Sequence, residues 1–469
     1  MSFGRAGLAF GTLVVAAVVS LGANDAVAQS KTPPAPPSAP VVPPPALRTS
    51  SLAQIVTELT RALGPVPAGA LVATSPITSD VPSPRADDLA LRLGAQLAGR
   101  LGPARAHTQP VTLPVARSIS GRAASLVYVQ LEIVKGELRA TADLYPVVSN
   151  GWERLRNPVP GPRAHAFASA PLDAEIRGFL APVVLEQASV HKAKHDEGDV
   201  LAIGCGDVDG DGGLELVLVT RQRVSIGRLR GGKVVVHKSA PWSSLASRSP
   251  VPMRDPLAAV LVSPVPHRGE IFLGTTDRGG IATDANLVTR RALTGIPVAG
   301  LDGEGCALPS GETSAFDGNA VACAAPAKGD PPVVLSALTP KYDAVAALSL
   351  VGKDGSVSEV VASREPNGKL HLKRSEPGQA PPTELTIDGT GAQVALVDLD
   401  LDGVAEVVTT ADGFADDTLT VSSFSKSKLT PRLRVPAKDG VRALAVCPPE
   451  ERGVPALVAV VGSEVWLVR

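Results

Sequence analysis

The stretch LAIGCGDVDGDGGLELVLVT, residues 201–220, and a second stretch, VALVDLDLDGVAEVVTT, residues 394–410, share one internal pattern. Each begins with a short apolar run, continues into a loop with aspartate at alternate positions followed by glycine, and ends in a second apolar run. An internal repeat of strand, acidic loop and strand is typical of propellers and solenoids. The sequence therefore indicates a repeat architecture around these two loops.

The spacing of the two loops favours a propeller. Asp207 and Asp398 lie 191 positions apart, which is about four times the roughly 40–50 residues of one four-stranded blade. Weaker copies of the two-strand pattern fall in phase with them, at 258–262 with 270–274, at 344–350 with 357–362, and at 441–446 with 456–461. We predict an all-β propeller of about six blades, with a range of five to seven, over residues 183–469.

The last of these blades is one strand short, because the chain ends soon after the apolar run at 465–468. A strand over 183–191, just before the first repeat, could supply the missing outer strand and close the ring. Closure removes the exposed strand edges that otherwise favour aggregation.

The acidic loops have the composition of a cation site. The first contains Asp207, Asp209 and Asp211, then Gly212 and Glu215, and the second contains Asp398, Asp400 and Asp402, then Gly403 and Glu406. Carboxylates brought this close repel one another unless a cation joins them. Calcium accepts six to eight oxygen ligands and tolerates an irregular geometry, whereas magnesium does not tolerate such a geometry. The alternative is a pair of solvated Asp-Gly turns that hold no metal.

The same loops differ from an EF-hand, which needs a glutamate at loop position 12 and a helix on each side. Position 12 is Leu218 in one loop and Thr409 in the other, and both loops run into strands. An acid at position 9 between two strands resembles the integrin-type FG-GAP/VCBS repeat. The resemblance implies a propeller with calcium in the loop that joins the first two strands of a blade. The ligands that it implies are Asp207, Asp209, Asp211 and Glu215, and Asp398, Asp400, Asp402 and Glu406, with a backbone carbonyl near Gly213 or Val404. Incomplete copies at 301–304 and 353–355 lack this set, and we expect no metal there.

The region before the propeller divides into three parts. Residues 1–28 have the pattern of a cleaved export signal, with Arg5, an apolar run and Ala26-Val27-Ala28; an uncleaved membrane anchor is the alternative. Residues 29–48 form a Pro-rich linker. Residues 49–182 are expected to be a small α+β domain. Its elements would be a helix at 52–63 that begins with the capping box Ser51-Leu52-Ala53-Gln54, a short strand at 70–74, a helix at about 85–101, a hairpin of 127–133 with 138–144, and a last helix at 172–180.

Four cysteines are present, and none has C-x-x-C spacing. In an exported protein an even number predicts two disulfides, and the alternative is four buried thiols. Cys306 and Cys323 flank a turn-rich segment of one blade, so we expect them to pair. Cys205 and Cys447 end the innermost strands of the first and last blades, which are neighbours in a closed ring, so a second bond between them is predicted.

Charge and motifs narrow the function. The net charge is −1 at pH 7. This balance excludes the general electrostatic attraction to phosphate groups on which nucleic-acid binders rely. Neither Gly-x-Ser-x-Gly nor a P-loop is present, and His191 and His195 lie too far apart on a strand to share one zinc ion. We predict an exported, periplasmic or secreted, non-enzymatic calcium-binding protein of the bacterial envelope or exterior. It would be a monomer without a membrane span after signal cleavage, and would serve as a binding, adhesion or scaffold module for a protein or cell-surface glycan. The alternative is a secreted hydrolase or lyase with a calcium-braced propeller.

Overall fold

The computed structural model describes residues 49–148, 151–156, 159–247, 256–263, 269–299, 305–310, 315–326, 330–352, 356–376, 378, 381–413, 416–449 and 453–469. By its contacts the chain divides into residues 1–46 and residues 47–469. The predicted export signal and Pro-rich linker, residues 1–28 and 29–48, lie outside the described residues, as do the incomplete acidic copies at 301–304 and 353–355.

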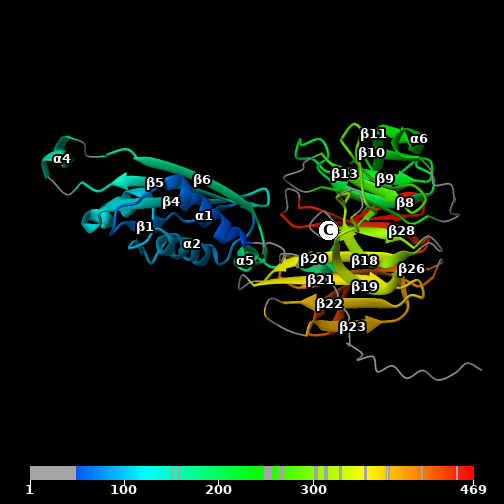
Figure 1. Ribbon diagram of the computed structural model, residues 1–469. Coiled ribbons are helices and arrows are strands. Elements are labelled where there is room, and N and C mark those ends of the chain that lie inside the picture. The colour runs from blue at the N-terminus through cyan, green and yellow to red at the C-terminus, as the bar shows by residue number, and fades with distance from the viewer. Residues whose placement is uncertain are drawn as a thin grey trace, which may run out of the picture. The chain divides into compact units, whose positions relative to one another are not determined.

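The described chain before strand β7 combines helices with a six-stranded sheet (Figure 1). The sheet has the order β3-β1-β4-β5-β6, with β2 paired to β4. Its strands are β1 (Leu71–Thr74), β2 (Thr78–Ser79), β3 (Arg105–Ala106), β4 (Ser125–Val134), β5 (Glu137–Pro146) and β6 (Ala164–Pro171). The helices are α1 (Ser51–Leu63), α2 (Ala86–Arg100), α3 (Leu113–Ile119), α4 (Gly151–Arg156) and α5 (Ala174–Arg177), with 3-10 turns η1 (Ser120–Arg122) and η2 (Leu185–Gln187).

Alternation along the hairpin β4–β5 explains this core. Every second side chain, from Val127 to Ile133 and from Leu138 to Leu144, belongs to one buried cluster. Because side chains alternate across a strand, these residues share one face of the sheet, which the apolar faces of α1 and α2 cover. Lys135 and Gly136 turn the hairpin with positive φ, 51° and 76°. The predicted order of helix, strand, helix and hairpin is therefore present.

Two helix ends differ from the sequence-based prediction. Ser50 rather than Ser51 caps α1, and its hydroxyl accepts a hydrogen bond from the first turn. The helix predicted over 172–180 is too long: α5 is a single turn, and its N-cap Asp173 accepts a hydrogen bond from the backbone N–H of Ile176.

Beyond β7 the described chain is built of sheets, with one short helix, α6 (Trp242–Leu245). Four sheets have four strands each, paired antiparallel in chain order. They are β12–β15 (Ala258–Val262, Ile271–Thr275, Gly279–Thr283, Thr289–Ala292), β16–β19 (Ile296–Pro297, Gly305–Pro309, Phe316–Ala322, Val334–Tyr342), β20–β23 (Ala344–Val351, Val357–Arg364, Leu370–Ser375, Thr383–Ile387) and β24–β27 (Thr390–Val397, Ala405–Ala411, Asp417–Ser425, Lys428–Ala437).

A fifth sheet of eight strands combines the beginning and the end of this region, in the order β28-β29-β30-β7-β11-β10-β9-β8. Its strands are β7 (Val190–Lys194), β8 (Val200–Gly206), β9 (Glu215–Thr220), β10 (Arg223–Arg230), β11 (Lys233–Pro241), β28 (Val441–Cys447), β29 (Ala456–Val461) and β30 (Glu464–Val468). The predicted closing strand is present as β7, which pairs antiparallel with β30. It begins later than predicted, because Leu185–Gln187 form η2.

The five sheets form a propeller-like arrangement. Strand β8 contacts β12, which in turn contacts β16, and β20 contacts β24, which contacts β28; β28 in turn contacts β8. An isolated bridge between Ala299 and Ala346 joins the β16–β19 sheet to β20. In Figure 1, β28 from the end of the chain lies beside β8. The predicted propeller is thus confirmed as a propeller-like fold.

Both predicted disulfides are confirmed. Cys205 and Cys447 join β8 to β28, the two edge strands of the eight-stranded sheet, with Cα atoms 4.9 Å apart. This bond makes the sheet nearly closed. Cys306 and Cys323 are bonded across β17 and β18, with Cα atoms 5.0 Å apart. The sequence predicts that the segment between these cysteines is rich in turns, partly because of Asp317-Gly318-Asn319, but these three residues lie within β18 at an irregularity in its pairing with β19.

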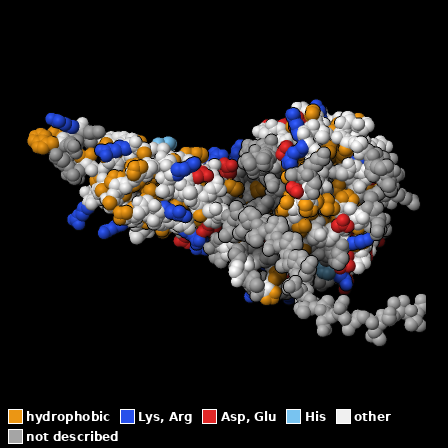
Figure 2. All heavy atoms as spheres, viewed as in Figure 1, with side chains coloured by type: hydrophobic (Ala, Val, Ile, Leu, Met, Phe, Trp, Pro, Cys, Tyr) orange, Lys and Arg blue, Asp and Glu red, His pale blue; other side chains and the backbone are white. Residues whose placement is uncertain are grey.

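None of the helices in the described part of the chain is long and apolar enough to cross a bilayer. On the face shown in Figure 2, acidic and basic side chains of the propeller-like part are interspersed among apolar ones.

Candidate metal centre

Two hairpins hold the acidic residues that the sequence singles out. The first acidic loop (residues 207–215) joins β8 to β9, and the second acidic loop (residues 398–406) joins β24 to β25. The strands pair right up to each loop, so Glu215 and Glu406 each lie opposite the residue that precedes the first aspartate. Strand register therefore places the position-9 acid beside the first aspartate in both hairpins.

Hydrogen bonds to the backbone shape both loops in the same way. The first aspartate accepts a hydrogen bond from a glycine N–H, at 3.0 Å from Gly212 to Asp207 and at 2.9 Å from Gly403 to Asp398. Both glycines have positive φ, 86° and 83°, which residues with a side chain rarely adopt. The glutamate accepts from the N–H that follows the first aspartate, at 2.7 Å in the first loop and 2.9 Å in the second. Each loop is thus folded around its own carboxylates.

The structure brings together three of the four predicted ligands of each loop, with one carboxylate oxygen per residue within 4.8 Å of the others. The clusters are Asp207, Asp209 and Glu215, and Asp398, Asp400 and Glu406. The third aspartates, Asp211 and Asp402, are not part of these clusters. Each instead accepts a hydrogen bond from the backbone N–H two residues later, at 2.8 Å in both loops.

The cluster in the second acidic loop is buried. Asp398, Asp400 and Glu406 are 8%, 7% and 0% exposed. Burial raises the pKa of Asp398 to about 7 and that of Glu406 to about 8, and it also raises the pKa of Asp400. The Oδ1 atom of Asp400 has no hydrogen-bond partner among the described residues. Buried carboxylates of this kind are costly until a cation joins them.

The cluster in the first acidic loop is more open and already contains a cation. The side chains of Asp209 and Asp211 are 47% and 51% exposed, while Glu215 is fully buried. The guanidinium of Arg228, on β10, lies among them and pairs with all three. Its hydrogen bond with Asp211 is the largest cause of the raised pKa of Arg228. Arg228 is not among the ligand residues that the sequence predicts for this loop.

Both clusters could hold a metal ion, because both offer carboxylate oxygens at short mutual distances, and oxygen is the donor that hard divalent cations prefer. The two loops are not equally suited to bind a metal ion. The second presents a buried oxygen with no partner, on Asp400. In the first loop, the guanidinium of Arg228 already pairs with the carboxylates of Asp209 and Glu215, which an ion would need as ligands.

The two histidines considered in the sequence analysis do not form a metal site. His191, in β7, is exposed and hydrogen-bonds Ser189 at 3.2 Å. His195 is buried, and neither of its ring nitrogens has a partner within the described part of the chain.

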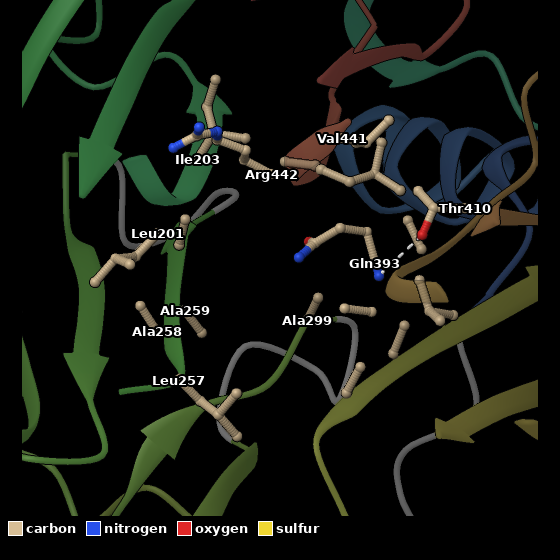
Figure 3. A pocket seen from close by; sticks show the side chains of 18 of the residues that line it. Leu201, Ile203, Leu257, Ala258, Ala259, Ala299, Gln393, Thr410, Val441 and Arg442 are labelled. Carbon is tan, nitrogen blue, oxygen red and sulfur yellow. Dashed lines mark hydrogen bonds between the residues drawn. The ribbon is translucent and has the colours of Figure 1, made fainter. Parts of the chain in front are cut away.

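A central cavity of about 1070 Å³ is the other candidate site. Residues of β8, β12, β16, β20, β24 and β28 line it. Figure 3 shows aliphatic side chains along its wall, among them Leu201 and Leu257, and the side chain of Gln393 extending into the space. Arg442, also in the lining, is ion-paired with Asp199 at 2.7 Å. The volume is sufficient for a small ligand or for part of a larger partner.

No protein-family model and no curated protein matches this chain. Several solved structures are similar to it in fold. A structure of the Dos1 propeller has 11% identity and a TM-score of 0.30, and covers 73% of this chain and 78% of its own. A glucose dehydrogenase has 14% identity and a TM-score of 0.36, with 60% and 98% covered. TolB from Acinetobacter baumannii has 12% identity and a TM-score of 0.28, with 87% and 95% covered. At these identities the likeness concerns the fold alone.

Proposed function

We propose that this chain is an exported calcium-binding propeller protein that acts by binding rather than by catalysis, as a binding, adhesion or scaffold module of the bacterial envelope or exterior. The observation that carries the proposal is the cluster in the second acidic loop. Three buried carboxylates converge there, and Oδ1 of Asp400 has no partner among the described residues. A cation would remove the repulsion between these groups and satisfy that oxygen.

Calcium suits this loop better than magnesium does. Calcium takes six to eight oxygen ligands in flexible geometry, whereas magnesium demands a near-ideal octahedron. Asp398, Asp400 and Glu406 are held by strand ends and backbone hydrogen bonds, which gives an irregular set of oxygens. The resemblance to FG-GAP/VCBS repeats supports the same ion. When bound, calcium would brace the hairpin between β24 and β25.

We also propose that the propeller has six blades in a closed ring. Four blades are the four-stranded sheets, and the other two are the halves β28-β29-β30-β7 and β11-β10-β9-β8 of the eight-stranded sheet. As paired strands, the two halves are joined through β7 and β11, whose parallel pairing is the short match Lys194–Lys233. Innermost strands from all six line one cavity, and Cys205–Cys447 joins the first blade to the last.

The cavity and the disulfides support a binding role outside the cytoplasm. An aliphatic wall with the amide of Gln393 and the pair Arg442–Asp199 is suited to holding a ligand, and we propose a protein or a cell-surface glycan as the partner. Two disulfides are typical of proteins that fold in an oxidising compartment.

Calcium is expected to raise the thermal stability of the purified protein and its capture of a partner. Extracellular calcium modules bind with dissociation constants of about 10⁻⁴–10⁻³ M, and an ion at ten times its dissociation constant adds about 1.4 kcal/mol to the free energy of unfolding. Melting curves in calcium and in chelator measure the first effect. Affinity capture from envelope extracts under the same two conditions measures the second.

The matched control is the double variant Asp398→Asn with Glu406→Gln, which should fold but lose both responses to calcium. Magnesium at the same concentration should give a smaller rise in melting temperature. Identical melting curves in calcium and in chelator would contradict the metal site. Chemical conversion of the captured molecule by the protein, instead of stable binding, would contradict the binding role.

A further inference from the structure

The first acidic loop contains a positive charge of its own. Nη2 of Arg228 lies 3.0 Å from Oδ2 of Asp209 and 2.8 Å from Oδ1 of Asp211. The same guanidinium donates a hydrogen bond from Nε to Glu215. The fourth predicted ligand, Asp207, accepts two backbone hydrogen bonds, at 2.7 Å and 3.0 Å. One guanidinium therefore binds three of the four carboxylates that the motif offers to a metal.

The second acidic loop has a serine at the corresponding place. Ser423 on β26 pairs with Glu406 on β25. Arg228 has the corresponding position on β10, because it follows Gly227, which pairs with Leu216, and it donates a hydrogen bond to Glu215. The Ser423 hydroxyl donates a hydrogen bond to Glu406 at 3.0 Å. A hydroxyl supplies no charge, so β26 contributes no counter-ion to the carboxylates of the second loop.

Two arginines lie near the second acidic loop, but neither is hydrogen-bonded to Oδ1 of Asp400. Nη1 of Arg432 lies 3.8 Å from Oδ2 of Asp400, and the same side chain is paired with Glu186 and donates to Ser423 at 3.2 Å. Arg177 is buried, and attraction to Asp400 partly opposes the lowering of its pKa by burial. Oδ1 of Asp400 still has no hydrogen-bond partner in the described part of the chain, and Asp400 is 7% exposed.

A metal ion and the Arg228 guanidinium would compete for the same oxygens. The guanidinium remains charged throughout the pH range in which proteins fold, and β10 holds it permanently beside the loop. An entering divalent ion would have to displace it and would then lie close to a like charge, which Coulomb repulsion disfavours. The planar guanidinium of arginine also matches the geometry of carboxylates well. Replacing it with a metal ion would therefore gain little binding free energy.

We propose that Arg228 is the built-in cation of the first acidic loop, and that the chain takes calcium in the second acidic loop alone, one ion per chain. Calcium in the second loop rests on the proposed function, whereas exclusion of metal from the first loop rests on Arg228. The same motif thus has two roles. One hairpin is braced permanently by the chain itself, and the other is braced when calcium is present.

Equilibrium dialysis against calcium, with the purified protein and an exchange of the two corresponding residues, tests this inference. The unchanged protein should bind one ion, Arg228→Ser should bind two, and Ser423→Arg should bind none. Arg223→Ser is the matched control, because Arg223 lies on the same strand but pairs with Glu197 at 2.8 Å; it should bind one ion. Circular dichroism and melting curves establish that each variant is folded.

Two ions on the unchanged protein, or the same number on the unchanged protein and on folded Arg228→Ser, would overturn the exclusion while leaving calcium in the second loop intact. No ion on the unchanged protein with one on Arg228→Ser would support the exclusion and overturn the proposed function. If Arg228→Ser does not fold, Asp207→Asn and Asp398→Asn decide the matter. The inference requires that Asp207→Asn keeps its ion and that Asp398→Asn loses it, and loss of an ion by Asp207→Asn would overturn it.

Discussion

Replacement of Cys205 and Cys447 together by serine is expected to lower the free energy of unfolding by about 5 kcal/mol in the chain-entropy model of disulfide stabilisation. The reason is the length of chain that the bond closes, since the two cysteines are separated by 242 positions. The bond also joins the two edge strands of the eight-stranded sheet, so its loss leaves ring closure to the pairing of β7 with β30. Equilibrium unfolding in urea, in saturating calcium, measures the change.

Cys306→Ser with Cys323→Ser is the matched control. That bond lies within one hairpin and spans 17 positions, for which the same model gives about 3 kcal/mol. The long-range bond should therefore cost clearly more to remove than the local one. Equal losses, or a larger loss for the local bond, would contradict a ring closed between β8 and β28.

In chelator, the stability of the protein is expected to fall as the pH rises between about 5 and 7.5, the opposite of the usual carboxylate effect. Burial raises the pKa of Asp398 from 3.8 to about 7, so the folded protein holds this proton more tightly than the unfolded chain does. Stability is therefore highest at low pH and is lost as the pH rises towards the folded-state pKa. A shift of about three units corresponds to about 4 kcal/mol in all, of which about 2–3 kcal/mol falls within this window.

Saturating calcium should abolish this fall, because a bound ion holds the carboxylates in their charged form and protons then compete with it. Asp398→Asn in chelator should remove the contribution of Asp398, and the difference between this variant and the unchanged protein isolates it from other titrating groups. Asp207→Asn, at the corresponding position of the first acidic loop, should keep the pH dependence that Asp398 causes. Urea unfolding at a series of pH values measures these slopes, and a chelated protein that gains stability with pH relative to Asp398→Asn would contradict a buried, uncompensated carboxylate.

Much of the propeller-like fold could be predicted because its strands are short apolar runs between turns. The runs at 258–262 and 456–461 coincide with β12 and β29. The disulfide Cys205–Cys447 followed from the same repeat, since the corresponding ends of β8 and β28 lie close together. Elements with a weak hydrophobic signal were missed, among them β6, whose alternating buried side chains are the small Ala166, Ala168 and Ala170, and the single-turn length of α5.

The acidic residues of the candidate site were also readable from the sequence, but the difference between the loops was not. Arg228 acts on the first loop across a strand pair, 13 positions after Glu215. Its counterpart Ser423 follows Glu406 by 17 positions, because the turn between β25 and β26 is longer than that between β9 and β10. Spacing alone therefore does not align the two residues. The burial of Asp400 is likewise a property of packing around the loop and leaves no local signal.

The most direct test of the calcium assignment is an anomalous difference map from crystals grown in saturating calcium, with data collected at long wavelength. One calcium peak is expected, bounded by Asp398, Asp400 and Glu406, with the guanidinium of Arg228 in the first acidic loop and no anomalous peak there. A peak between Asp209 and Glu215, or no peak in the second acidic loop, would contradict calcium binding by the second loop alone.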